Sequence, residues 1–248
     1  MRLRLNHHAL ICAVVVLLPL VPGPVTAAPI LVNGSFESGF TNWVRVDQIG
    51  SDGTFFLQAG TTSPVNGLPV PSPTDGTFAA MTDPMGPGSH VLYQDFLVPL
   101  GTTSGTLTFD LFVGNQATAF STPNTLDFST PALNQQARVD VLLGGTDPFT
   151  LLATDILLNV FQTAVGDPLV SGYNTVSVDV GALLAANAGS TLRLRFAEVD
   201  NVNLFNLGVD RVSLEASGTA SAPEPSTLLL FGVGLTSVVS LRRRTRRR

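Results

Sequence analysis

The chain has 248 residues, enough for one large domain or two small ones, and its formal net charge is −5. The charge is unevenly distributed, because six of the 13 arginines follow Leu241 and there is no lysine. Between residues 29 and 222, five arginines face 17 acids, which gives this body a net charge of −12. An acidic body repels nucleic acid and anionic lipid surfaces, so we expect no nucleic-acid partner.

Residues 1–28 have the three regions of a secretory signal peptide. Two arginines precede an apolar run over residues 9–20, and small residues follow, so we expect a signal helix that is removed by cleavage after Ala27 or Ala28. Prolines end the run short of the roughly 20 residues that a spanning helix needs. The single cysteine, Cys12, leaves with this segment, so the mature chain should contain no disulfide.

Strands are predicted in the first half of the body from short apolar runs and from period-two alternation. These strands cover residues 30–32, a stretch beginning at Trp43, and residues 54–58, 77–81, 91–98 and 106–113. Residues 60–75 contain four prolines, and residues 114–136 are polar and without period. Proline lacks a backbone donor, so we predict two long surface loops here, and they are our candidates for a recognition surface.

The second half of the body continues the alternation, with strands predicted at residues 139–143, 156–161, 175–180, 191–196 and 208–215. Two glycines within residues 144–148 suit a tight turn, which predicts a hairpin between residues 139–143 and 149–152. Residues 180–187 have helical propensity, but the segment is too short for more than two turns. It is the only helix that we expect in the body.

The predicted elements define an all-β fold. Nine to eleven strands separated by Gly/Pro turns, with no βαβ spacing, indicate a single antiparallel β-sandwich, and the need to protect sheet edges favours a jelly roll. We assign residues 29–217 to this domain and residues 218–222 to a small polar linker. The sandwich is therefore flanked by the N-terminal signal helix and by a C-terminal apolar segment.

Candidate catalytic groups are scarce. The mature body contains one histidine, His90, and no cysteine or lysine, so a nucleophilic triad is nearly excluded. His90 follows Pro87-Gly88-Ser89 at the start of a strand, and we predict that it is a surface residue. Seventeen scattered acids always contain some pair, so paired carboxylates carry no specific signal for glycoside hydrolysis. We assign no catalytic residue and predict that the protein is not an enzyme.

The body resembles the galactose-binding-like jelly rolls, in particular carbohydrate-binding modules that open with an Asn-x-x-Phe-Glu-x-Gly…Trp pattern. The opening matches at Asn33, Phe36, Glu37, Gly39 and Trp43, and the closing Asp-x-Val-x-Leu pattern at Asp210, Val212 and Leu214. The resemblance implies a jelly roll with Trp43 in its core. It also implies a structural calcium ion at Glu37 and Asp210, which Asn33 and Asp47 would help to complete. It identifies no ligand-binding residue.

The C-terminal residues 223–248 have the order of a sorting tag: Pro223-Glu224-Pro225, an apolar run over residues 228–241 and a basic end. They resemble the PEP-CTERM sorting signal of Gram-negative bacteria, which implies cutting near the tripeptide by a membrane-embedded exosortase. At about 1.5 Å per residue the predicted transmembrane helix 228–241 spans only about 21 Å, short for a permanent anchor. The basic cluster that would hold the end in the cytoplasm is Arg242, Arg243, Arg244, Arg246, Arg247 and Arg248.

The two ends suggest a route and a destination. We expect export through the inner membrane of a Gram-negative bacterium, transient membrane insertion, and release to the cell envelope or an exopolysaccharide matrix. There the domain would act as a non-catalytic structural or carbohydrate-binding component, with exosortase and exopolysaccharide as partners. Two alternatives remain open: an extracellular carbohydrate-active hydrolase on the same sandwich, and a membrane-anchored adhesion domain whose tail is never cut.

Overall fold

The computed structural model describes residues 24–219, so the predicted signal helix before residue 24 and the predicted transmembrane helix 228–241 lie outside the described residues. Residues 24–219 form eleven strands and one helix. They are β1 (Pro24–Pro29), β2 (Val44–Asp47), β3 (Phe55–Gln58), β4 (Ala79–Thr82), β5 (Gly88–Leu97), β6 (Thr102–Asn115), β7 (Gln135–Leu143), β8 (Ile156–Gln162), β9 (Asn174–Asp179), α1 (Gly181–Ala186), β10 (Thr191–Asp200) and β11 (Phe205–Thr219). Within this range, no helix is long and apolar enough to cross a bilayer.

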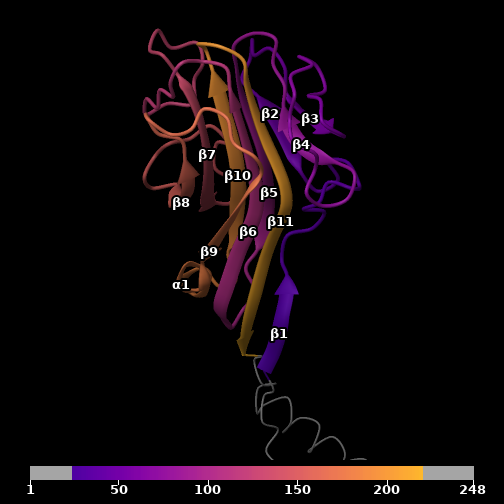
Figure 1. Ribbon diagram of the computed structural model, residues 1–248. Helices are drawn as coiled ribbons and strands as arrows, with labels where there is room; N and C mark the ends of the chain where they lie inside the picture. Colours follow the sequence, from indigo (N-terminus) through magenta and orange to yellow (C-terminus); the bar gives the residue numbers. More distant parts are fainter. Residues whose placement is uncertain (1–23, 220–248) are drawn as a thin grey trace, which may run out of the picture. The chain divides into compact units, whose positions relative to one another are not determined.

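The strands form two antiparallel sheets (Figure 1). One sheet has the order β3-β4-β11-β6-β9, with β1 paired to the far part of β11, and the other has the order β2-β5-β10-β7-β8. Consecutive strands share a sheet at β3–β4 and β7–β8, and elsewhere the chain crosses from one sheet to the other. This is the connectivity of a jelly roll, so the predicted all-β sandwich is confirmed.

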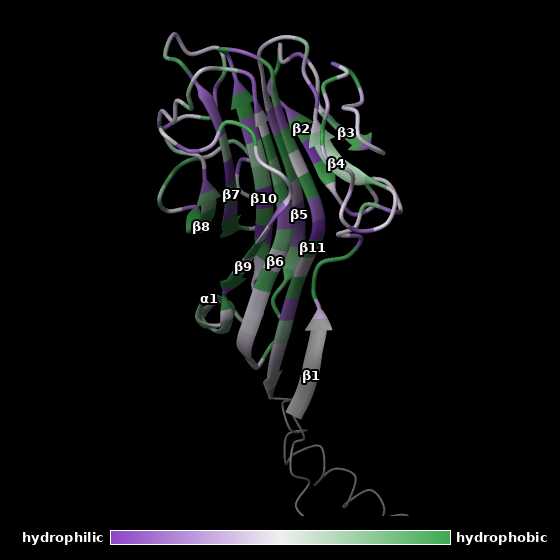
Figure 2. Cartoon of the chain, in the orientation of Figure 1, coloured by the Kyte–Doolittle hydropathy of each residue, from purple (hydrophilic) through white to green (hydrophobic). Residues whose placement is uncertain are grey.

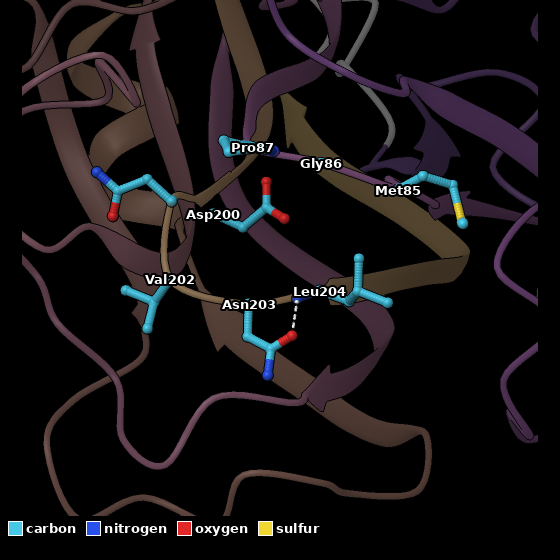
Figure 3. Close-up of a pocket in the computed structure, with 8 residues that line it drawn as sticks. Met85, Gly86, Pro87, Asp200, Val202, Asn203 and Leu204 are labelled. Atoms are coloured by element: carbon cyan, nitrogen blue, oxygen red, sulfur yellow. Dashed lines mark hydrogen bonds between the residues drawn. The ribbon is translucent and has the colours of Figure 1, made fainter.

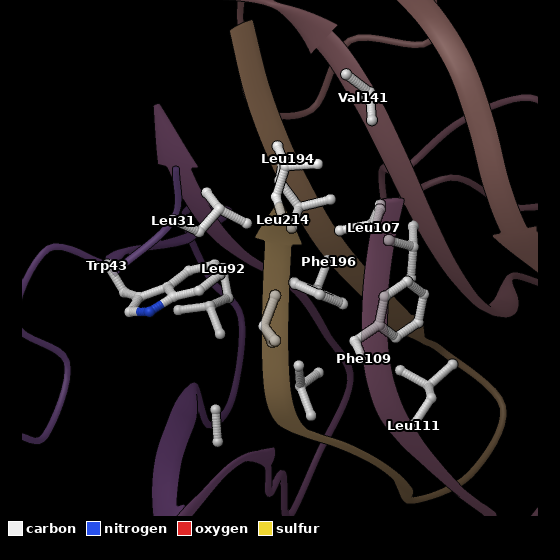
Figure 4. Packing of buried hydrophobic residues seen from close by; sticks show 14 of the residues in the cluster. Leu31, Trp43, Leu92, Leu107, Phe109, Leu111, Val141, Leu194, Phe196 and Leu214 are labelled. Atoms are coloured by element: carbon white, nitrogen blue, oxygen red, sulfur yellow. The ribbon is translucent and has the colours of Figure 1, made fainter. Parts of the chain in front are cut away.

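The hydrophobic core lies between the sheets and is built by period-two alternation (Figure 2). Leu194 and Phe196 of β10 face Leu107 and Phe109 of β6, and all four are buried (Figure 4). The Phe196 ring meets Phe109 edge-on, with the centroids 5.3 Å apart, and its centroid lies 6.1 Å from that of Trp43. Trp43 is only 5% exposed, so its predicted core position is confirmed.

Of the predicted helix and the predicted hairpin, the helix is confirmed and the hairpin is wrong. Helix α1 forms inside the predicted range 180–187. The predicted hairpin between residues 139–143 and 149–152 is wrong, because β7 pairs with β8 instead. Residues 149–152 belong to a connection whose carbonyls accept hydrogen bonds from buried arginines: Arg195 donates to the carbonyl oxygens of Pro148 and Thr150, at 2.8 Å each. These side-chain donors take the place of a ladder partner.

Strand β1 overlaps the predicted signal peptide. It begins at Pro24 and pairs with residues 215–219 of β11, so it contains both predicted cleavage positions, Ala27 and Ala28. Cleavage at either position would remove most of this strand while leaving its last residue, Pro29, on the domain. The main body of the sandwich, from β2 onward, does not depend on it for its sheet order.

A buried ion-pair network lies on the outer face of the sheet β2-β5-β10-β7-β8. Asp140 of β7 is fully buried and accepts hydrogen bonds from Arg138 at 2.7 and 2.8 Å, from Arg195 of β10, and from Asn159 of β8 at 2.8 Å. Burial alone would raise the pKa of Asp140, but the Arg138 hydrogen bond and the charges of Arg195 and Arg138 hold it below 3.8. One carboxylate therefore joins three neighbouring strands.

Candidate functional site

The segment that follows β1, residues 33–43, is held together by its own hydrogen bonds. The Asn33 side chain donates to the carbonyl oxygens of Gly39 and Thr41, at 2.9 and 3.0 Å, and its Oδ1 accepts from the Ser38 amide at 3.1 Å. The Trp43 indole donates to the Asn33 carbonyl at 2.9 Å. Asn33 thus organises residues 33–43 from inside, and its side chain is engaged with the backbone.

Glu37 and Asp210 are brought to the same segment, residues 74–78. Oε1 of Glu37 accepts the backbone N–H groups of residues 77 and 78, both at 2.7 Å. Oδ2 of Asp210 accepts those of residues 74 and 75, at 2.6 and 2.9 Å. Both acids thus contact one segment, and the role that their contacts show is to hold this loop against the sandwich.

The predicted calcium set fits these contacts poorly. Oδ2 of Asp210 already accepts three donors including the Thr74 hydroxyl, and Oδ1 accepts the Arg211 amide at 2.7 Å. The positive ends of these dipoles point to where a cation would sit. Asp47, predicted to complete the set, is bound elsewhere, to His90. Calcium at Glu37 and Asp210 therefore stays a prediction that these contacts do not favour, and thermal denaturation with and without EGTA tests it.

Truncating Asp210 to alanine is expected to loosen one end of this loop. The amides of residues 74 and 75 lose their acceptor, and we expect their local opening to become easier by about 1–3 kcal/mol. Amide hydrogen exchange measures this directly. Glu37→Ala is the matched control, because it should release residues 77 and 78 and leave residues 74 and 75 protected. Unchanged exchange at residues 74 and 75 in Asp210→Ala contradicts the clamp.

The Trp and Tyr side chains of the described residues have their faces occupied. Trp43 is in the core. The Arg193 guanidinium lies over the Tyr93 ring, 3.7 Å from its centroid. Tyr173 packs against Phe112, with centroids 5.9 Å apart, and burial raises the pKa of its hydroxyl. A sugar ring usually stacks on an exposed aromatic face, so none of these three rings supplies a ready platform.

A pocket of about 190 Å³ opens where β10 ends and where β5 and β11 begin (Figure 3). It is lined by residues 85–87 and 200–204, and Asp200 points into it. The lining residues come from neither of the two loops, 60–75 and 114–136, that were predicted as the recognition surface. The pocket walls combine backbone, apolar side chains, two asparagines and one carboxylate.

A buried polar cluster adjoins this pocket: His90 of β5 with Glu198 and Asp200 of β10. One ligand atom from each residue lies within 4.8 Å of the others. The prediction that His90 is a surface residue is wrong, since His90 is fully buried. It is in phase with Leu92 and Phe96 on the inner face of β5, and that parity is the sequence signal that would have placed it correctly.

Burial dominates the electrostatics of the two acids. It raises the pKa of Glu198 well above 4.5, and the charge of Asp200 adds to this effect. Burial also raises the pKa of Asp200 to about 8, against the lowering effect of the Gly88 amide. Two unneutralised charges are therefore unfavourable at this position at neutral pH. The donor set, one imidazole and two carboxylates, is of the type that binds transition metals.

Comparison with known proteins bears on both parts of the chain. Among solved structures, the chain resembles the K3 cleaved adhesin domain of Lys-gingipain from Porphyromonas gingivalis w83. The identity is 17% over 77% of this chain and 99% of that one, and the TM-score is 0.45. It also resembles TmCBM61 in complex with beta-1,4-galactotriose, at 11% identity over 75% and 97% of the two chains and a TM-score of 0.42. A family 11 carbohydrate-binding module from Clostridium thermocellum gives 13% identity, 77% and 96% coverage, and a TM-score of 0.40.

No curated protein matches the chain. At the C-terminus, residues 221–244 match the model of the PEP-CTERM protein-sorting motif. This range contains Pro223, Glu224 and Pro225, the predicted helix 228–241 and the first arginines of the basic cluster. The chain is thus an antiparallel β-sandwich followed by a PEP-CTERM protein-sorting motif.

Proposed function

We propose that this protein is exported, processed by an exosortase at its PEP-CTERM motif, and retained in the cell envelope or exopolysaccharide matrix as a non-catalytic carbohydrate-binding or structural component. The observation that carries the proposal is the sorting motif at residues 221–244, which starts directly after the last strand of the sandwich, β11. The partners are the exosortase, the inner membrane before processing, and exopolysaccharide afterwards.

The arrangement of acids supports binding over hydrolysis. A glycoside hydrolase places two carboxyl groups on opposite sides of the scissile bond. Glu198 and Asp200 instead lie two positions apart on one face of β10, and of the two only Asp200 lines the pocket, so this pair of acids does not flank it. The pocket, at about 190 Å³, is also smaller than the roughly 300–1,000 Å³ of typical ligand sites. A surface that binds a polymer from outside suits this geometry better than a cleft that encloses it.

The strongly acidic body suits a matrix protein. The net charge of −12 between residues 29 and 222 keeps the domain soluble by self-repulsion once the basic tail is removed. It also directs the choice of polymer, because an acidic polysaccharide would be repelled unless cations bridge the two. We therefore propose a neutral polysaccharide, or an acidic one in the presence of divalent cations, as the ligand.

Processing is tested by intact-mass analysis of the protein from membrane and extracellular fractions of a producing strain. We expect the main product to end near residues 223–225. Glu224→Ala should accumulate as an uncut precursor in the membrane fraction, because it breaks the Pro-Glu-Pro signature. Glu215→Ala, which replaces an exposed acid on β11, is the control and should be processed normally. A wild-type product that retains residues 228–248 in both fractions overturns processing and favours the membrane-anchored adhesion domain.

A further inference from the structure

The cluster of His90, Glu198 and Asp200 contains buried polar atoms that no group in residues 24–219 satisfies. His90 Nε2 and both carboxylate oxygens of Glu198 are buried without a hydrogen bond of normal geometry there, although the Thr82 side chain lies close enough to Glu198 to lower its pKa against the effect of burial. His90 and Glu198 lie directly opposite each other in the β5–β10 register, and Asp200 is opposite Gly88. Buried polar atoms are almost always satisfied, and one ligand atom from each of His90, Glu198 and Asp200 lies within 4.8 Å of the others, so this cluster calls for a bound group.

The tautomer of His90 is set by its other neighbour. Nδ1 of His90 lies 2.7 Å from Oδ1 of Asp47, its cross-strand partner on β2. An ionised carboxylate only accepts, so Nδ1 carries the proton and, in a neutral ring, Nε2 presents a bare lone pair to Glu198 and Asp200. This is the arrangement of metal-bound histidines, which donate the opposite N–H group to a carboxylate or a carbonyl.

Gly88 keeps the space beside Nε2 open. A Cβ atom on Gly88 would lie 2.4 Å from His90 Nε2, close to the 2.0–2.1 Å or so at which Zn²⁺ binds imidazole nitrogen. The Gly88 amide also donates to Oδ1 of Asp200 at 2.9 Å, which orients the second carboxylate. Gly88 therefore orients the Asp200 carboxylate through its backbone amide. Because Gly88 has no side chain, it also leaves room for a metal ion beside His90 Nε2.

We propose that His90, Glu198 and Asp200 bind a divalent transition-metal ion, with Zn²⁺ as the first choice. An ion of charge +2 neutralises two buried carboxylates, and an imidazole ligand favours Zn²⁺ over Ca²⁺, which takes six to eight oxygens. Asp47 is the outer partner that orients the histidine. Asp200 lines the pocket of Figure 3, so the remaining coordination position faces solvent and takes an oxygen donor such as water or a polymer hydroxyl.

The alternative to metal binding is that Glu198 and Asp200 are protonated and the site holds no metal ion. The two states are separated with Zn²⁺ alone as the probe, added to the exported protein after treatment with EDTA and removal of the chelator. Isothermal titration is expected to show one equivalent of Zn²⁺ bound per chain. His90→Gln and Glu198→Gln should abolish this binding, and Gly88→Ala should block it while removing no ligand.

Asp47→Asn tests the outer partner, and we expect it to weaken Zn²⁺ binding by about 10–100-fold. Asp95→Asn is the control, because Asp95 binds Arg193 on the opposite face of the sheet and should leave Zn²⁺ binding unchanged. Circular dichroism establishes that each variant is folded. Absence of Zn²⁺ binding by the wild type, or wild-type binding by folded His90→Gln or Glu198→Gln, overturns the proposal.

The wild type alone also gives a decisive readout, should the variants fail to fold. After signal removal at the predicted position, His90 is the only histidine, so its ring nitrogens give unique signals in ¹H–¹⁵N spectra. One equivalent of Zn²⁺ should shift Nε2 and leave Nδ1 protonated. Unchanged Nε2 at saturating Zn²⁺ contradicts coordination by His90. Neither experiment involves the sorting motif or a polysaccharide, so the result is independent of the proposed function.

Discussion

Replacing Asp140 with asparagine is expected to destabilise the domain by about 3–5 kcal/mol, the usual cost of removing one partner from a buried ion pair. The side chains of Asp140 and Arg195 are both fully buried, and Arg138 is nearly so. The asparagine keeps the shape but removes the charge, so two guanidinium groups are left buried without a counter-ion. Urea denaturation followed by circular dichroism measures the loss.

Asp95→Asn is the matched comparison for this network. Asp95 binds Arg193 through two hydrogen bonds, at 2.6 and 2.9 Å, but its own side chain is 38% exposed. Water screens such a pair, so we expect a loss of only about 1 kcal/mol. Equal losses in Asp140→Asn and Asp95→Asn contradict the view that burial makes Asp140 the critical carboxylate.

The network also gives stability a defined dependence on pH. The pKa of Asp140 is lower in the folded protein than its ordinary value of 3.8, because the stabilising effects of Arg138 and Arg195 exceed the effect of burial. A lowered folded-state pKa adds stability that is complete above the unfolded pKa and is lost as the pH falls through the folded value. We therefore expect the stability difference between wild type and Asp140→Asn to shrink below about pH 4. A difference that stays constant between pH 7 and pH 3 contradicts this assignment.

Truncating Phe196 to alanine is expected to cost about 3–5 kcal/mol, because it removes a fully buried ring and leaves a cavity. Phe196 is 0% exposed and lies between Trp43 and Phe109, so its truncation removes both of these ring–ring contacts from the core. The free energy of unfolding in urea measures the effect. The fluorescence of Trp43, the only tryptophan, reports the change in its packing.

Two controls define this prediction. Phe196→Leu keeps most of the apolar volume and should cost about 1.5 kcal/mol or less. Leu97→Ala truncates an apolar side chain that is 62% exposed on β5, and we expect a change within about 0.5 kcal/mol. If Phe196→Ala lowers the free energy of unfolding by no more than Leu97→Ala does, Phe196 is not a central core residue and the prediction is contradicted.

The sequence predicted the fold well because period-two alternation carries most of the information about a sandwich. It placed β9, β10 and the helix α1 close to their positions in the structure. The β7–β8 pairing was missed, because the two glycines at residues 144 and 145 look like a tight turn in isolation. The side chains of Arg193 and Arg195 hold the longer connection in place, and such tertiary contacts leave no local signal.

For the candidate site, the same alternation also indicates which polar side chains are buried. Glu198 and Asp200 continue the inner-face phase of Leu194 and Phe196 on β10, and His90 shares the phase of Leu92 on β5. Their burial was therefore predictable from parity. Their convergence was not, because the β5–β10 register brings together residues more than a hundred positions apart and depends on the whole sheet.

The proposed function is tested most directly by one assay that measures binding and hydrolysis in the same sample. The exported protein is mixed with insoluble exopolysaccharide from its own producing strain, sedimented, and the supernatant assayed for reducing sugar. We expect the protein to sediment with the polymer and the reducing ends to stay at the level of the protein-free control. Reducing sugar that accumulates with time, and that disappears with Glu198→Gln, would show that the protein is a hydrolase and contradict a non-catalytic role.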